Sequence, residues 1–118
     1  MSINQQVKEL LDTKIRIGKT VVPVAHLRYT GKSKTFIVWT VTGETPELIG
    51  DDEYLYNTVD IDIDIYSDKN YIEILNYIKN LFIDDDWYFM EQSAEMYEED
   101  EKLYHVTLSF QKEIMNNG

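Results

Sequence analysis

The 118-residue chain contains no cysteine. That absence excludes disulfides and thiol chemistry, and it fits a protein that folds in a reducing compartment. The length falls in the usual range for one domain, and the 43% hydrophobic content is enough to build one core. We therefore expect a single domain spanning residues 1–118.

Positive charge is scarce. The chain has 11 basic against 22 acidic residues, a formal net charge of -11, and only two arginines, Arg16 and Arg28. Affinity for phosphate backbones comes from clustered lysine and arginine, so we expect no direct binding to DNA or RNA. The acidity serves either solubility or a contact with another protein.

Long apolar runs are also missing. No run approaches the roughly 20 residues that a membrane span requires. Residues 1–6 lack the basic segment followed by an apolar stretch that marks a signal peptide. We expect a protein that works in water, without a membrane partner.

Hydrophobic periodicity predicts two helices. Ser2 is a favourable N-cap with Gln5 at capping-box spacing, and apolar residues at helical spacing then predict a helix over residues 3 to 12. Ser67 is the expected N-cap of the second helix, which residues 84–86 terminate. Its expected buried stripe contains Tyr71, Ile74, Leu75, Ile78, Leu81 and Phe82.

Strand signals occur in five segments. Pro23 cannot donate to a sheet ladder, so it should open a strand or lie on an edge. A hairpin is expected from the first two strands, followed by a loop over residues 43–53, where glycine, proline and aspartate gather. The predicted strands cover residues 24–30, 35–42, 59–65, 87–96 and 103–110.

The segment 59–65 carries the clearest pattern, a strict alternation of apolar and acidic residues. Such alternation predicts a strand with one buried face (Val59, Ile61, Ile63, Ile65) and one face presenting Asp60, Asp62 and Asp64. The element order α-β-β-β-α-β-β predicts an α+β fold, a mainly antiparallel sheet with both helices packed on it.

Two tripeptides, Gly18-Lys19-Thr20 and Gly31-Lys32-Ser33, imitate part of a phosphate-binding loop. Such a loop also needs a glycine five positions earlier, where this chain has Thr13 and His26. The aspartate row resembles the start of a calcium loop but lacks its later glycine and glutamate. We expect neither a nucleotide nor a calcium site.

Residues in an arrangement suited to catalysis are equally sparse. His26 and His105 lie far apart, no Ser-His-Asp spacing stands out, and an alternating strand gives its carboxylates no asymmetric environment. We expect no enzyme, no catalytic residue, no cofactor and no metal. The tract 84–101, with nine acidic residues and no basic one, is either a solvated hairpin or a docking surface for a basic partner.

The arrangement around residues 59–67 resembles the tail terminator (tail completion) proteins of long-tailed bacteriophages, prophages and tailocins. The resemblance comprises the alternating strand ending in an aromatic residue, Ser67-Asp68, and the amphipathic helix that follows. Matching features elsewhere are the N-terminal helix, Val22-Pro23-Val24, residues 43–46 and the closing strand pair. The similarity covers residues 3 to 112.

This resemblance implies a structural protein, not an enzyme. It implies a ring, typically a hexamer, that caps the head-proximal end of the tail tube, ends tube polymerisation and provides the surface for head joining. The implied partners are further copies of the chain, the tail tube protein and a head-completion or neck protein. The implied location is the virion, after assembly in the bacterial cytoplasm.

In that setting we expect the loop 43–53 or the tract 84–101 to reach a neighbour or an axial partner, because ring subunits meet through two different patches. The acidic row Asp60, Asp62 and Asp64 is a candidate lining of the central channel. The alternative function is an acidic DNA mimic that inhibits a basic nucleic-acid-binding protein. The expected interface residues are Glu44, Pro46, Leu48, Ile49, Asp51, Asp52, Tyr54, Tyr56, Glu98, Glu99, Asp100 and Glu101.

Overall fold

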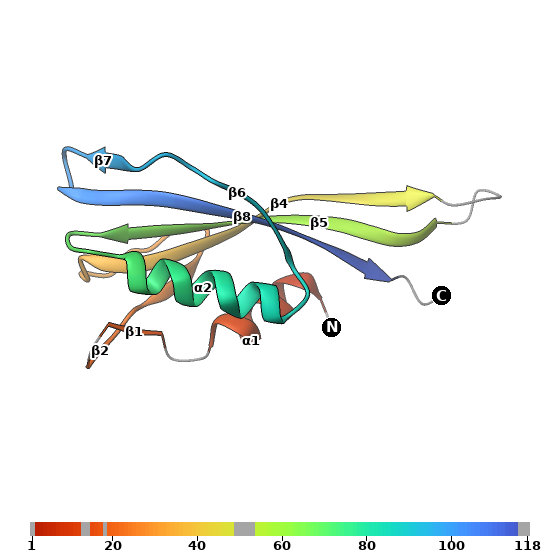
Figure 1. Ribbon diagram of the computed structural model, residues 1–118, viewed down its shortest axis with the longest axis horizontal. Helices are drawn as coiled ribbons and strands as arrows, with labels where there is room; N and C mark the ends of the chain where they lie inside the picture. Colours follow the sequence, from red (N-terminus) through yellow and green to blue (C-terminus); the bar gives the residue numbers. More distant parts are fainter. Residues whose placement is uncertain (1, 13–14, 18, 49–53, 116–118) are drawn as a thin grey trace.

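A computed structural model describes residues 2–12, 15–17, 19–48 and 54–115. A six-stranded sheet has the order β3-β4-β5-β8-β6, with β7 also paired to β8. Both helices lie on one face of this sheet (Figure 1), which confirms the predicted α+β class. The elements are α1 (Ile3–Leu11), β1 (Arg16–Ile17), β2 (Thr20–Val21), β3 (Val24–His26), β4 (Thr35–Leu48), β5 (Tyr54–Ser67), α2 (Ile72–Asp84), β6 (Tyr88–Gln92), β7 (Met96–Glu98) and β8 (Leu103–Met115).

The core lies between the sheet and the helices. The apolar residues of β5 predicted to face inward (Val59, Ile61, Ile63, Ile65) are all fully buried, and they join one cluster with the buried side of α2. Val7 and Leu11 of α1 complete this layer. The Ser2 cap is also confirmed, because its side-chain oxygen accepts the Gln5 amide at 3.2 Å. Alternation and helical periodicity together therefore locate the core correctly.

The second helix begins later than predicted. Ser67 is the last residue of β5, and its buried hydroxyl lies 2.9 Å from the Thr35 hydroxyl on β4. The helix starts at Ile72, whose amide donates to the Asn70 side chain at 2.9 Å. Ser67 is thus not the N-cap, because cross-strand pairing extends the sheet to this residue.

The predicted hairpin of residues 24–30 and 35–42 is wrong. The first strand is confined to β3 and runs parallel to β4, with Val24 opposite Ile37 and His26 opposite Trp39. Leu27 then takes a positive φ of 69°, and residues 28–34 return the chain to the start of β4. Local sequence signals mark strands but not their direction, so the parallel pairing could not be inferred.

Residues 43–48 are not part of a loop. They continue β4, which stays paired to β5 as far as Leu48 opposite Tyr54, with a bulge next to Gly43. Because β3 pairs only with residues 37–39, this half of β4 is a sheet edge, where Pro46 is tolerated. The rest of the predicted loop, residues 49–53, lies outside the described residues.

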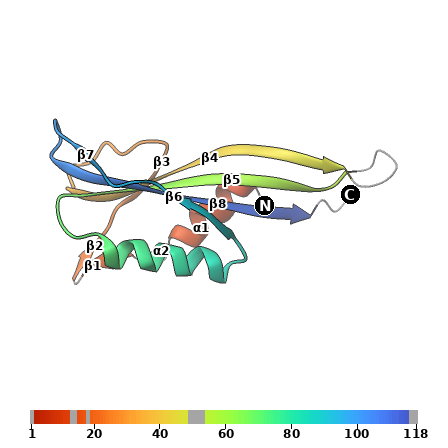
Figure 2. The ribbon, with the colours of Figure 1, turned by 45° about the horizontal axis from the view of Figure 1, so that its top comes forward.

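The far halves of β4, β5 and β8 extend past both helices and form an arm (Figures 1 and 2). The molecule is elongated as a result, with extents of 53 × 26 × 24 Å. A small antiparallel pair, β1 with β2, was not predicted, because strands of two residues carry no periodic signal. The last predicted strand pair is present, with its first member divided into β6 and β7.

Candidate functional site

The acidic row of β5 lies on the sheet face away from the helices, and each carboxylate contacts β8. Gln111 donates to Asp60 at 2.9 Å, and Ser109 donates to Asp62 at 2.8 Å. The Thr107 hydroxyl donates to Asp64 at 2.5 Å. All three aspartates are half-buried. The row is therefore a set of cross-strand pairs, with each carboxylate held by a neutral donor.

His105 joins this row at the end nearest β7. Its Nε2 lies 2.9 Å from Asp64 Oδ1, and its Nδ1 lies 3.3 Å from Glu98 Oε1. The hydrogen bond to Asp64 raises the pKa of His105 above its usual value, although burial opposes the shift. Burial raises the pKa of Asp64, but hydrogen bonds from His105 and Thr107 outweigh it and leave that pKa lowered.

His105, Asp64 and Glu98 form a group that we name the clamp, and its geometry suits a structural contact better than acid–base catalysis. A general base must keep one imidazole nitrogen free for the substrate, and both nitrogens of His105 face carboxylates. A catalytic acid needs a raised pKa, and that of Asp64 is lowered. The contacts instead fasten β7 to β5. Among the described residues, no cluster of histidines and carboxylates is arranged to hold a metal ion.

An aromatic ladder crosses the same face. Tyr29 stacks on Phe36 at 4.4 Å between ring centroids, Phe36 on Tyr66 at 4.8 Å, and Tyr66 on His105 at 4.1 Å. The ladder borders a hollow of about 460 Å³. Sequence reasoning missed this feature, because its members come from a loop and three strands. The lining residues are Leu27, Arg28, Tyr29, Phe36, Val38, Asp64, Tyr66, Glu98, Glu101 and Leu103.

The hollow has an apolar floor. Val38 is 7% exposed and Leu103 is 4% exposed, although both lie on the face away from the main core. The alternation along β4 could have predicted this apolar floor, because Phe36 and Val38 are at positions whose side chains lie on the face away from the helices. Burial raises the pKa of Tyr66, and the nearby charge of Asp64 adds to this effect. The hollow therefore combines apolar contact area with negative charge.

The structure separates the two groups of predicted interface residues. Glu44 and Pro46 are exposed on the arm, and Asn57 donates to Glu44 at 3.2 Å. Tyr56 is half-buried there, and Leu48 and Tyr54 are paired through their backbones. Ile49, Asp51 and Asp52 lie outside the described residues. The second group, Glu98 to Glu101, lies at the β7–β8 turn, at the opposite end of the long axis (Figure 1).

The edge formed by β6 and β7 exposes both apolar and acidic side chains. Tyr88, Met90, Met96 and Tyr97 are exposed, together with the carboxylates of Glu91, Glu95, Glu99 and Asp100. We name these eight residues the acidic edge. Apolar side chains surrounded by charge are typical of a surface that meets another protein. The tract 84–101 thus combines both features of a docking surface.

The comparisons with known proteins concern the fold. No protein-family model and no curated protein matches the chain. None of the helices within the described residues is both long and apolar enough to span a membrane. Among solved structures, a chain in the virion of a native gene transfer agent (GTA) particle matches with a TM-score of 0.54 and 12% identity, covering 96% of this chain and 91% of that chain. The chain therefore shares its overall fold with a protein found in a gene transfer agent virion.

Proposed function

We propose that the chain is a structural protein of a phage or phage-like particle and acts as a tail terminator. It forms a ring, a hexamer in our proposal, on the head-proximal end of the tail tube, where it ends tube polymerisation and offers the surface for head joining. The observation that supports this function is the fold shared over nearly the full length of both chains with a protein of a gene transfer agent virion.

The surfaces of the molecule support a role in assembly with other chains more than a role in catalysis. Among the described residues, the sheet ends in two strands, β3 and β6, that each pair on one side only. Residues 40–48 of β4, on the arm, have no second partner strand in this described part and form a further edge. Unpaired strand edges are natural docking surfaces for other chains. The proposed partners are further copies of the chain, the tail tube protein and a head-completion or neck protein.

The arm is the proposed contact with the tube or with the neck protein. Its exposed residues Glu44 and Pro46 lie far from the β7–β8 turn, so one subunit can bind an axial partner with its arm and a neighbour with its body. A ring that caps a tube needs both kinds of contact.

The direct test is tube assembly. The tail tube protein of the same phage or phage-like particle is polymerised with and without the chain, and tubes are imaged in negative stain. We expect extra density at one tube end and shorter tubes as the chain is added. A Glu44→Arg, Pro46→Ala variant should bind tube ends less tightly. Tubes that grow to the same length with both ends bare would remove the terminator role.

The acidic tract 84–101 also supports a second function, inhibition of a basic nucleic-acid-binding protein by mimicry of DNA. That function requires neither rings nor tube ends. Salt-sensitive, one-to-one binding to such a protein, with no effect on tubes, would favour it over the terminator role.

A further inference from the structure

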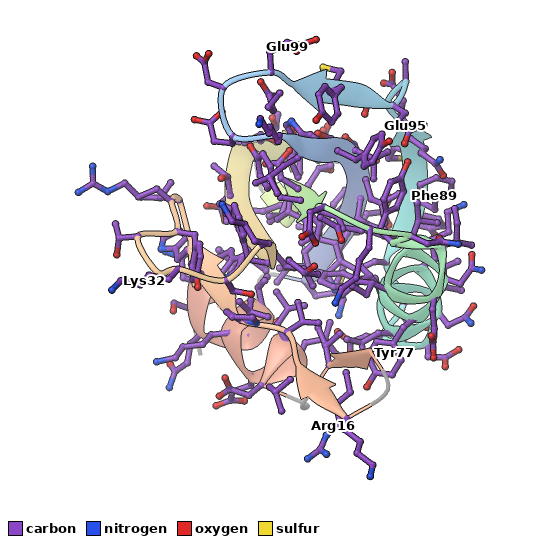
Figure 3. The ribbon with its side chains drawn as sticks, turned by 90° about the vertical axis from the view of Figure 1, so that its left-hand side faces the viewer. Arg16, Lys32, Tyr77, Phe89, Glu95 and Glu99 are labelled. Carbon is purple, nitrogen blue, oxygen red and sulfur yellow. The ribbon has the colours of Figure 1, made fainter. Side chains whose placement is uncertain are left out.

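Charge is divided unevenly along the chain. Residues 1–34 contain seven of the 11 basic residues and only two of the 22 acidic residues. The same segment folds into α1, β1, β2, β3 and the connection that precedes β4. These elements gather on one side of the molecule, away from β6 and β7 (Figure 3). The uneven distribution of charge along the sequence therefore gives the two sides of the structure different charge.

The side formed by the N-terminal elements is basic and partly apolar. Arg16, Lys19, Lys32 and Lys34 are exposed, as are the apolar residues Val21 and Leu27. We name these six residues the basic side. Within the described part of the chain, none of its four cations forms an ion pair. Arg28 is left out because it lines the hollow beside Glu98 and Glu101. The positive charge of this side is thus available to another molecule.

The acidic edge is its counterpart. It has exposed apolar side chains among four exposed carboxylates, and it includes the terminal strand of the sheet. Figure 3 shows Lys32 and Arg16 on the side of the molecule away from Glu95 and Glu99. The two surfaces therefore point in different directions and cannot satisfy each other within one copy.

We propose that copies of this chain associate head to tail, with the acidic edge of one copy packed against the basic side of the next. The proposal rests on the ring function above and assigns the surfaces that build the ring. Opposite charge attracts unlike sides and makes like sides repel, which fixes the order of the subunits. A two-fold dimer through either surface is disfavoured for the same reason. Repetition of the unlike contact gives a ring when the rotation closes.

Two charge-reversal variants test the assignment. One carries Glu91→Lys, Glu99→Lys and Asp100→Lys, so that both of its sides are basic. The other carries Arg16→Glu, Lys32→Glu and Lys34→Glu, so that both of its sides are acidic. A control variant carries Glu44→Lys, Glu47→Lys and Glu113→Lys on the arm. It changes the net charge of the chain by the same amount as the first variant does. All changed residues are at least partly exposed, and circular dichroism checks that each variant folds.

Self-association is measured by analytical ultracentrifugation at about 50 mM salt and again at about 500 mM, where charge pairs are screened more strongly. The wild-type chain and the arm control should associate, and salt should weaken both. Each reversed variant alone should stay monomeric. An equimolar mixture of the two should associate again, because basic and acidic copies can then alternate in a ring with an even number of subunits.

The outcomes separate this contact from the terminator role. Reversed variants that associate like the wild type, or a mixture that stays monomeric, would overturn the proposed contact. So would a wild-type chain that forms rings neither alone nor on tubes. Rings that depend on charge as expected but never bind tubes would refute the terminator role and leave the contact standing. Reversed variants that cap tubes as well as the wild type would refute the contact alone.

Discussion

At the scale of single residues, the most informative group is the clamp of His105, Asp64 and Glu98. The sequence shows an acidic strand and a histidine 41 positions away, with nothing to join them. The register of β5 against β8 brings them together by placing Tyr66 opposite His105 and Asp64 opposite Thr107. His105 thereby gains two carboxylate partners, Asp64 and Glu98. Their identity depends on strand pairing and could not be predicted.

This clamp makes stability depend on pH. The pKa of His105 is raised, so its contribution is full below the ordinary value of 6.5 and is lost as pH rises through the folded pKa. The pKa of Asp64 is lowered, so its contribution is full above 3.8 and is lost as pH falls through the folded value. The pair therefore stabilises the fold most between these two values, and part of the free energy of unfolding should be lost as the pH rises above 6.5 and through the folded pKa of His105.

Titration of the His105 imidazole by NMR measures the effect. We expect a pKa above 6.5 in the wild type and a lower one in Asp64→Asn, which removes the largest cause of the shift. Asp68→Asn, an exposed carboxylate outside the clamp, is the matched control and should leave the titration unchanged. A pKa of 6.5 or less in the wild type, or one that Asp64→Asn does not move, would contradict the clamp.

At the scale of elements, burial patterns were predictable, and so was the last strand pair, but the partner and direction of β3 were not. The alternation of β5 and the apolar stripe of α2 place Ile63 and Ile78 in the core from sequence alone, because one-sided burial imposes periods of two and 3.6 residues. The direction of β3 depends on where the chain turns at Leu27. The length of β4 depends on pairing with β5 overriding the local signals of Gly43 and Pro46.

The buried side of α2 can be tested with two isoleucines in the same helix. Ile78 is 0% exposed and Ile83 is 49% exposed. Ile78→Ala leaves a cavity beneath the sheet and should lower the free energy of unfolding by about 2–5 kcal/mol. Ile83→Ala removes the same atoms from a half-solvated site and should change it by about 0.5 kcal/mol or less. Urea denaturation compares them, and equal effects would contradict the placement of the helix.

At the scale of the whole molecule, the proposed contacts use different parts of the structure. In the proposed ring, the acidic edge meets the basic side of a neighbouring subunit, and the arm extends along the long axis of the molecule. The two faces of the sheet then remain. One is covered by both helices (Figure 2), and the other carries the aspartate row. We propose that a ring built through this contact turns one of these faces toward the central channel. The sequence identified the row, but only the fold shows that it occupies a face that the proposed lateral contacts leave open.

A row with fewer charges tests whether that face lines the channel. Asp60→Asn with Asp62→Asn removes two charges but keeps oxygen acceptors for Gln111 and Ser109, so the strand pairing should survive. Asp62→Lys goes further and attracts the phosphates that the native carboxylate repels. If the row faces the channel, rings and tails should form normally while DNA delivery falls, more for Asp62→Lys than for the asparagine pair. Asp68→Lys adds the same charge beyond the end of β5 and should have no effect. Normal delivery by Asp62→Lys particles would mean that the aspartate row does not face the passing DNA.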